Sequence, residues 1–288
     1  MQILRDDSIG ILGRVTGLLG SWRRLFLGAA SLAVFIALWS LYSAWLHGDW
    51  PFAYRSWSQP AEYIPYPSEV LYAFVDSFTH RDPFTSLYMT SHIYASLKRM
   101  FFGFVLAFLV AVPLGLLMGR SANAEAIGKP LVELFRPIPP LAWVPIFLIA
   151  LKLFWGPIAI VFLGIFFPIL LNVMFGAKSV DPVLIDAART LGAKRRDIFT
   201  KVVLPFTIPY MMTGIKVGIG VGWMCIVAAE MLGAVGGGVG LFIYNMAYQG
   251  TMYDRMYAGM LVIGLLSVLT TGAAGFLEQR LSRWMGMK

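Results

Sequence analysis

The chain has 288 residues, of which 58% are hydrophobic and 13% charged, and 23 Lys and Arg against 15 Asp and Glu give a formal net charge of +8. Soluble domains carry about 25% charged and about 45–50% apolar residues, so this composition excludes an ordinary soluble enzyme or binding module and favours a membrane protein. The single cysteine, Cys225, cannot form an intramolecular disulfide, and no Cys/His cluster predicts a metal site. A basic excess in a membrane protein is first a topology signal, so it does not predict nucleic-acid binding.

Long apolar runs predict an all-α membrane protein with six transmembrane helices. A basic N-terminal segment, residues 1–24, precedes the first run, residues 25–46, which is too long for a signal peptide and has no cleavage site after it. The other five predicted spans are residues 100–118, 141–153, 156–176, 208–232 and 256–276.

The segments between the spans are less apolar. Residues 47–98 are predicted to form one long polar segment, in which residues 69–78 have helical spacing and are expected to lie along the membrane surface. Residues 120–136 are predicted to be a polar turn, and residues 281–288 a basic tail. Arg99 begins the second span and is expected either to anchor at the membrane interface or to contact a partner protein on that side.

The most polar run of the second half is residues 181–205, within a loop of residues 178–207. Pro182 fits the first turn of a helix, apolar residues follow at helical spacing, and Gly192 is placed as a C-terminal stop. A second short helix is predicted from Lys194 to Val203, ending at Leu204-Pro205. Two short amphipathic helices with an apolar ridge directed away from the lipid predict a partner protein that covers the ridge.

The distribution of positive charge predicts the orientation of the chain. Sixteen of the 23 Lys and Arg residues fall in the N-terminus, the 120–136 segment, the 177–207 loop and the residues that follow the last predicted span. Because cytoplasmic loops carry an excess of Lys and Arg, both termini and the 181–205 loop are expected in the cytoplasm, and residues 47–98 outside it.

The spacing of residues in this loop resembles the EAA loop of permease subunits of ATP-binding-cassette (ABC) importers, which reads Glu-Ala-Ala, x3, Gly, x9, Ile-x-Leu-Pro. Asp replaces Glu at position 186, and Val replaces Ile at position 202, which keeps charge sign and apolar character. The residues that the resemblance assigns to coupling with an ATPase are Asp186, Ala187, Ala188, Leu191, Gly192, Leu204 and Pro205.

Further runs resemble the branch of these permeases that carries nitrate, sulfonates such as taurine, and bicarbonate: residues 65–70, 136–145, 228–233 and the glycine-rich residues 236–240. The resemblance implies the type I ABC importer (MetI-like) fold, with residues 99–280 as the permease core and the coupling loop between spans four and five. It implies a multi-pass protein in the cell membrane of a prokaryote.

The resemblance also implies partners: a second permease subunit in a homodimer, two ATP-binding subunits and an extracytoplasmic solute-binding protein. No phosphate-binding GxxxxGK[ST] loop occurs in the chain, so ATP and Mg²⁺ are expected on the partner ATPase. No catalytic or cofactor-binding residues are predicted here.

The fifth span supplies the candidate residues for the translocation pathway or gate: Gly214, Lys216, Gly218, Trp223 and Glu230. Gly214 and Gly218 form a GxxxG pair that lets helix backbones approach. Lys216 either faces the pathway or extends to the lipid headgroups. Glu230 is either an interfacial carboxylate, with Arg255 as one candidate partner, or part of the pathway.

Two function classes compete with the importer. A secondary transporter that works without an ATPase would be expected to show inverted repeats and broken spans, and it leaves the EAA spacing unexplained. A membrane enzyme would need a catalytic or metal-binding constellation within the spans, and the sequence offers none.

Overall fold

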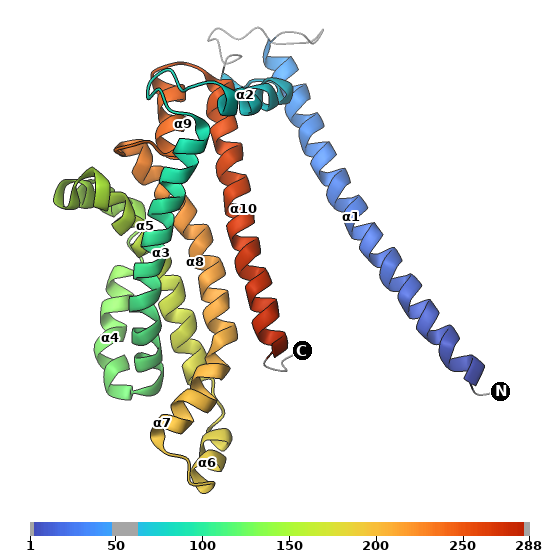
Figure 1. Cartoon of the computed structure of the whole chain (residues 1–288), viewed down its shortest axis with the longest axis vertical. Helices are drawn as coiled ribbons and strands as arrows, with labels where there is room; N and C mark the ends of the chain where they lie inside the picture. Colours follow the sequence, from blue (N-terminus) through green and yellow to red (C-terminus); the bar gives the residue numbers. More distant parts are fainter. Residues whose placement is uncertain (1–2, 48–62, 285–288) are drawn as a thin grey trace. The chain divides into compact units, whose positions relative to one another are not determined.

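The computed structural model (Figure 1) describes residues 3–47 and 63–284, and helices are the only regular elements in these ranges. The chain divides into two compact units, and the boundary between them follows Tyr72. Residues 1–2, 48–62 and 285–288 lie outside the described residues. They belong to the predicted N-terminal segment, the predicted 47–98 segment and the predicted C-terminal tail, respectively.

In the first unit, helix α1 (Ile3–His47) is apolar from Phe26 to His47, nearly the same residues as the first predicted span. The helix already begins at Ile3, although the sequence of residues 1–24 shows little periodic pattern. Trp39 Nε1 donates a hydrogen bond to the Pro65 carbonyl (3.1 Å), and Ser43 Oγ donates one to the Ile64 carbonyl (3.0 Å). These bonds join α1 to the residues before helix α2 (Pro67–Thr79), which covers the predicted surface helix.

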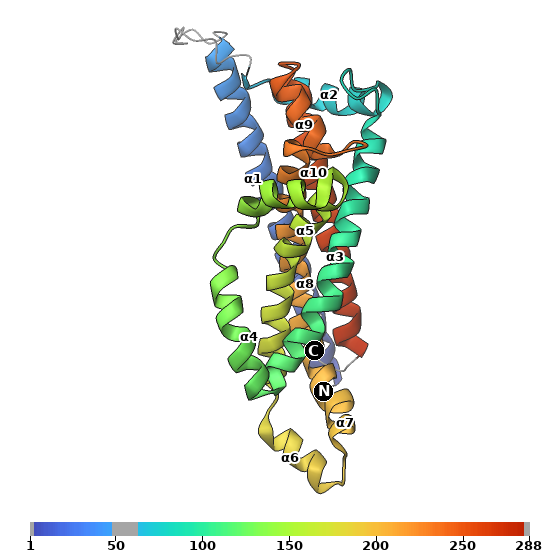
Figure 2. The same ribbon diagram turned by 90° about the vertical axis from the view of Figure 1, so that its left-hand side faces the viewer.

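The second unit is built on four long helical elements: α3 (Met89–Arg120), α5 (Val144–Lys178), α8 (Leu204–Leu232) and α10 (Tyr253–Trp284). Helices α3, α8 and α10 and the second part of α5 lie alongside one another, whereas the first part of α5 lies across them (Figures 1 and 2). The short helices are α4 (Ala122–Phe135), α6 (Pro182–Thr190), α7 (Arg195–Ile198) and α9 (Val239–Tyr248). A 3₁₀ turn at Pro140–Trp143 precedes α5, and a π-helical turn at Phe199–Val203 joins α7 to α8. Helices α6 and α7 lie at one end of the long helices and α9 at the other (Figure 1).

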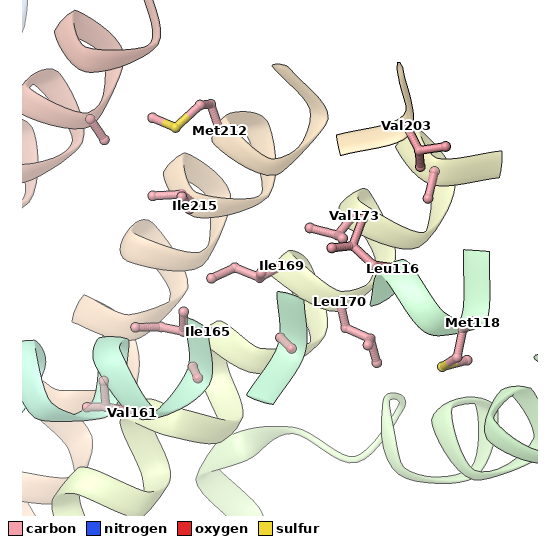
Figure 3. Close-up of a cluster of buried hydrophobic side chains, with 14 of the residues drawn as sticks. Leu116, Met118, Val161, Ile165, Ile169, Leu170, Val173, Val203, Met212 and Ile215 are labelled. Carbon is pink, nitrogen blue, oxygen red and sulfur yellow. The ribbon is translucent and has the colours of Figure 1, made fainter. Parts of the chain in front are cut away.

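The core lies where α3, α5 and α8 face one another, with their aliphatic side chains directed into the same space (Figure 3). Ile165, Ile169 and Val173 of α5 are fully buried. A Cβ added at Gly115 of α3 would lie 2.9 Å from the Leu170 carbonyl oxygen, and one at Gly214 of α8 would lie 3.0 Å from Ile169 Cα. Glycine at these two positions therefore allows α3 and α8 to lie close to α5, as small residues do between membrane helices.

The structure does not confirm the predicted number of spans. Five helices of the described residues are long and apolar enough to cross a membrane, so six spans are not confirmed. The predicted third span (141–153) and the predicted fourth span (156–176) correspond to two helical segments that meet at a kink at Lys152 (φ 63°), although both segments carry the label α5. This kink lies four residues before the Gly156-Pro157 pair, so the break between the two segments falls within a few residues of the predicted boundary.

The interpretation of residues 120–136 as a polar turn is wrong. Ser121 caps a helix there by accepting a hydrogen bond from the Ala124 N–H (3.3 Å), and α4 then runs for 14 residues. No residue of α4 is buried. Its apolar residues alternate with Glu125, Lys129 and Glu133, and this mixed composition hid the helix in the sequence.

Candidate functional site

The first candidate site is the surface of helices α6 and α7. Asp181 Oδ1 accepts a hydrogen bond from the Val183 N–H (2.8 Å) and caps α6, with Pro182 in its first turn. Gly192 ends the helix with φ +79°, the left-handed conformation that only glycine adopts without cost. The Ala193 N–H then bonds the Ala188 carbonyl (3.0 Å) and closes the turn. The predicted order of helix, glycine and second helix is confirmed.

Some apolar side chains of α6 and of the turn after it are exposed at the surface. Ile185 and Ile198 are buried beneath α6 and α7, whereas Leu184 is half exposed and Leu191 is 87% exposed. Beside them lies a cavity of about 470 Å³, lined by apolar residues and by Arg120, Arg189 and Arg195. We call Leu184, Leu191 and this cavity the α6–α7 surface. It suits a partner that contributes apolar and acidic side chains.

The second predicted helix of the loop does not end at Leu204-Pro205. The π-helical turn Phe199–Val203 carries α7 directly into α8, so residues 195–232 form one continuous helix of 38 residues. Pro205 sits in the first turn of α8, where its missing N–H and fixed φ are tolerated. A displacement of the α6–α7 surface would therefore act directly on α8, and π-helical turns are frequent at functional positions.

The candidate pathway residues do not form one cluster. Gly214 and Gly218 face α5, and Trp223 is 2% exposed and donates its Nε1–H to Thr270 Oγ1 of α10 (2.9 Å). Lys216 forms an ion pair with Glu278 of α10, and both side chains are partly exposed. Glu230 lies near the end of α8 that leads to α9. Helix packing accounts for three of these five residues.

Glu230 belongs to a buried network of charges and backbone groups at the α9 end. Arg99 of α3 donates from Nη1 to Glu230 Oε1 (2.6 Å) and to the Gly237 carbonyl (2.7 Å). Its Nη2 donates to the Val235 carbonyl (2.7 Å). Arg99 is 5% exposed and Glu230 is fully buried. The expected interfacial anchoring of Arg99 is therefore wrong, and so is the pairing of Glu230 with Arg255, which binds Asp76 instead (2.7 Å).

The backbone of the turn between α8 and α9 completes this Arg99–Glu230 network. Ser96 Oγ lies 2.8 Å from Glu230 Oε2 and accepts a hydrogen bond from the Val239 N–H (2.9 Å). The Gly240 N–H donates to Glu230 Oε2 (3.0 Å). A Cβ at Gly238 would lie 2.5 Å from Glu230 Cδ, so glycine is required for the turn to pass the carboxylate.

A second polar group continues the network along α3. His92 Nδ1 lies 3.1 Å from the Gly238 nitrogen, and His92 Nε2 lies 3.4 Å from Asp82 Oδ2. Thr85 Oγ1 donates to Asp82 Oδ2 (2.6 Å). Burial alone would raise the pKa of Asp82, but hydrogen bonds from His92, Thr85 and the Phe84 N–H outweigh burial and lower that pKa. The loop before α3 is thereby tied to the glycine turn.

The sequence carried a signal for this network that the prediction missed. His92, Ser96 and Arg99 recur at helical spacing and are all buried, so they share one polar face of α3. A carboxylate and a guanidinium near the same end of two spans are an expected ion pair, because isolated charges within membranes are costly. Among the described residues no group of three or more His, Cys, Asp or Glu could hold a metal ion.

Comparison with known proteins adds a family match. The family model described as "Binding-protein-dependent transport system inner membrane component" matches residues 111–283. The taurine transport system permease TauC of Escherichia coli is 32% identical over 92% of this chain and 91% of its own length. The nitrate import permease NrtB of Synechocystis sp. is 36% identical over 65% of this chain and 67% of its own. The bicarbonate transport system permease CmpB of Synechococcus elongatus is 33% identical over 66% of each chain.

A solved structure is similar in fold. An inward-facing structure of the MetNI methionine ABC transporter superposes with a TM-score of 0.59 at 21% sequence identity, over 67% of this chain and 95% of that chain. This similarity shows that the fold is that of an ABC transporter permease.

Proposed function

Because the chain belongs to the family of binding-protein-dependent transport system inner membrane components and is the permease subunit of an ABC importer, we propose that it carries a small oxyanion across the membrane. The chain is a transport component, and ATPase activity lies on a separate subunit. The family match leaves the secondary-transporter alternative without support.

The proposed solute class rests on the relatives. Permeases for taurine, nitrate and bicarbonate are 32–36% identical to this chain over most of its length. All three solutes carry oxygen atoms with negative charge, whereas the rest of each molecule differs. An oxyanion group is therefore the shared chemistry, and the choice among these solutes is assigned to the extracytoplasmic binding protein.

We assign ATPase docking to the α6–α7 surface, and the single observation that carries this assignment is the 87% exposure of Leu191 at the Gly192 turn. Desolvating one such leucine contributes about 1.5–3 kcal/mol, enough to anchor an interface. The nearby arginines favour acidic groups on the ATPase. In this proposal ATP and Mg²⁺ bind two ATPase subunits, and their closure moves α6, α7 and the continuous helix α8.

A second permease subunit is proposed to cover the side of α4 and the start of α5. Ile127 and Leu134 of α4 and Ile149 of α5 are among the most exposed aliphatic residues of the chain. A second copy of this chain would complete the pathway between two such subunits. Both termini and the α6–α7 surface are assigned to the cytoplasm, and α9 to the extracytoplasmic side, where the binding protein would deliver the solute.

Among the pathway candidates, Lys216 and Glu230 are proposed to hold helices in position instead of contacting the solute. The Lys216–Glu278 pair joins α8 to α10, and Glu230 fixes the turn before α9, so both are proposed to act on helix position. Gly214, Gly218 and Trp223 are proposed to set the helix contacts along which α8 moves.

The test is uptake by the assembled importer in proteoliposomes that contain ATP. Labelled taurine, nitrate and bicarbonate are compared with a neutral sugar, each in the presence of the binding protein encoded with the complex. We expect ATP-dependent uptake of one oxyanion and none of the sugar. Uptake of the sugar alone would overturn the proposed solute class while leaving the importer assignment in place.

A further inference from the structure

A pocket of about 450 Å³ lies at the α9 end of the second unit, where it is lined by the first turns of α3, by α5 and by the glycine turn. It is separate from the α6–α7 surface, which lies at the other end. Its lining includes two cations, three hydroxyl groups and two phenylalanines, and no carboxylate: Thr90, Ser91, Tyr94, Ala95, Lys98, Arg99, Phe102, Phe154, Ile158, Val235 and Gly236.

Most of the donors in this pocket lack a protein partner. No carboxylate of the described residues forms an ion pair with Lys98, although nine ion pairs occur elsewhere in those residues. The hydroxyl groups of Ser91 and Tyr94 likewise have no hydrogen bond within the described part of the chain. Ser91, Tyr94 and Lys98 follow one another at intervals of three and four residues, so they share one face of α3.

Arg99 adds a fixed positive group to the pocket wall. Its three hydrogen bonds to Glu230, Gly237 and Val235 use three of the five N–H groups of a guanidinium. The carboxylate that neutralises it is fully buried and does not line the pocket. The Arg99–Glu230 network therefore holds the guanidinium at the wall in one orientation, and Lys98 adds a charge without a counterion.

We propose that this pocket is a binding subsite for an oxyanion, such as a nitrate, sulfonate, bicarbonate or phosphate group. Lys98 supplies the charge, the Ser91 and Tyr94 hydroxyls donate hydrogen bonds, and Arg99 closes the inner wall. Hydrogen bonds from cationic groups to oxyanions are the strong ones in proteins. The assignment of the pocket to the extracytoplasmic side rests on the proposed function, in which it would receive the delivered solute.

The same chemistry would also bind the headgroup phosphate of an anionic lipid such as phosphatidylglycerol, so the test must separate the two sources. Ser91→Cys is introduced into the assembled importer, which is reconstituted in phosphatidylcholine vesicles. The rate of its modification is measured with an impermeant anionic methanethiosulfonate and with a cationic one. Native Cys225 is 2% exposed, so the unmodified chain serves as the unreactive background. Thr79→Cys, an exposed position on α2 outside the pocket, is the matched control.

At each position we take the ratio of the modification rate with the anionic reagent to the rate with the cationic reagent. We expect this ratio to be several-fold higher at Ser91→Cys than at Thr79→Cys. Millimolar nitrate, taurine or sulfate should slow the Ser91→Cys reaction several-fold, and a neutral sugar should not. Lys98→Gln should abolish both effects, and Lys98→Arg should keep them. Protection that appears only when phosphatidylglycerol replaces phosphatidylcholine would identify the oxyanion as a lipid headgroup.

The subsite is overturned if neither free anions nor phosphatidylglycerol protect Ser91→Cys, or if Lys98→Gln leaves the protection unchanged. ATP-driven uptake by the unmodified importer in the same vesicles keeps the two proposals apart. Normal oxyanion uptake without protection removes the subsite alone, whereas absent oxyanion uptake counts against the proposed function.

Discussion

Arg99 Nη1 lies 2.6 Å from Glu230 Oε1, although 131 residues separate them in the sequence. The pair connects α3 to the end of α8, and the carbonyls and N–H groups of the glycine turn occupy the remaining positions around it. Removing one partner of such a buried pair leaves an uncompensated charge, which is more costly than the pair itself is favourable. The position of the turn before α9 therefore depends on both charges.

The first prediction concerns this pair. Glu230→Gln should destabilise the protein by about 3–5 kcal/mol, because the Arg99 guanidinium stays buried without its counterion. Thermal unfolding of the purified complex in mild detergent measures the loss. Glu133→Gln, which removes a carboxylate from an exposed pair on α4, is the control and should change stability by less than about 1 kcal/mol. Equal effects of the two variants would show that the buried pair has no special role.

The second prediction tests the glycine turn. Gly238→Ala should displace the Glu230 carboxylate, since the added Cβ would lie 2.5 Å from Glu230 Cδ, and the φ of +155° disfavours a side chain as well. Gly264→Ala on α10 meets nothing within 4 Å and should be neutral or slightly stabilising. Unfolding temperatures of the two variants are compared. A Gly238→Ala protein as stable as Gly264→Ala would contradict the described geometry.

The third prediction concerns two glycines of the same helix. Gly214 lies against α5, and an added Cβ would lie 3.0 Å from Ile169 Cα, whereas Gly220 has nothing within 4 Å. Gly214→Leu should separate α8 from α5 and lower both stability and uptake, and Gly220→Leu should preserve folding. Overpacking of this kind costs about 1–3 kcal/mol. Expression of monodisperse protein and uptake rate are the measurements, and a reversed order would exclude Gly214 from the helix contact.

Much of the fold was predictable from the sequence. Long apolar runs indicated the helices, and α3, α8 and α10 include the predicted runs 100–118, 208–232 and 256–276. The first helix of the loop could be predicted because its signals are local: Pro182 lies in the first turn of α6, and Gly192 ends the helix. Caps and left-handed glycines act within a few residues, so spacing alone reveals them.

The rest depended on contacts between distant residues. The kink in α5 falls at Lys152, which is neither glycine nor proline, so the residue type at that position does not reveal the break. Likewise, the choice between Arg99 and Arg255 as the partner of Glu230 is decided by how α3 and α8 pack. Lys216 was ambiguous for the same reason, and its pairing with Glu278 depends on the packing of α10 against α8.

The fourth prediction is a pH dependence. The folded-state pKa of Asp82 is lowered, so the stability that this carboxylate contributes is fully present above its unfolded pKa, near 3.8, and is lost as pH falls through the folded pKa. Asp82→Asn should therefore destabilise the protein at pH 7, and the difference from the unmodified chain should shrink as the pH approaches 3. Unfolding temperatures across this range measure it. If the difference in unfolding temperature between Asp82→Asn and the unmodified chain grew as the pH fell, the folded-state pKa of Asp82 would be raised and not lowered.

The central claim is that the chain couples to an ATPase through the α6–α7 surface, and co-purification from native membranes tests it most directly. Tagged protein should retain one ATP-binding subunit per permease, and Leu191→Asp should reduce that ratio about tenfold, since an interface anchor contributes about 1–2 kcal/mol or more. Leu191→Met, which keeps the apolar contact, should bind as the unmodified chain does. An undiminished ATPase ratio in Leu191→Asp, with normal insertion into the membrane, would contradict the claim.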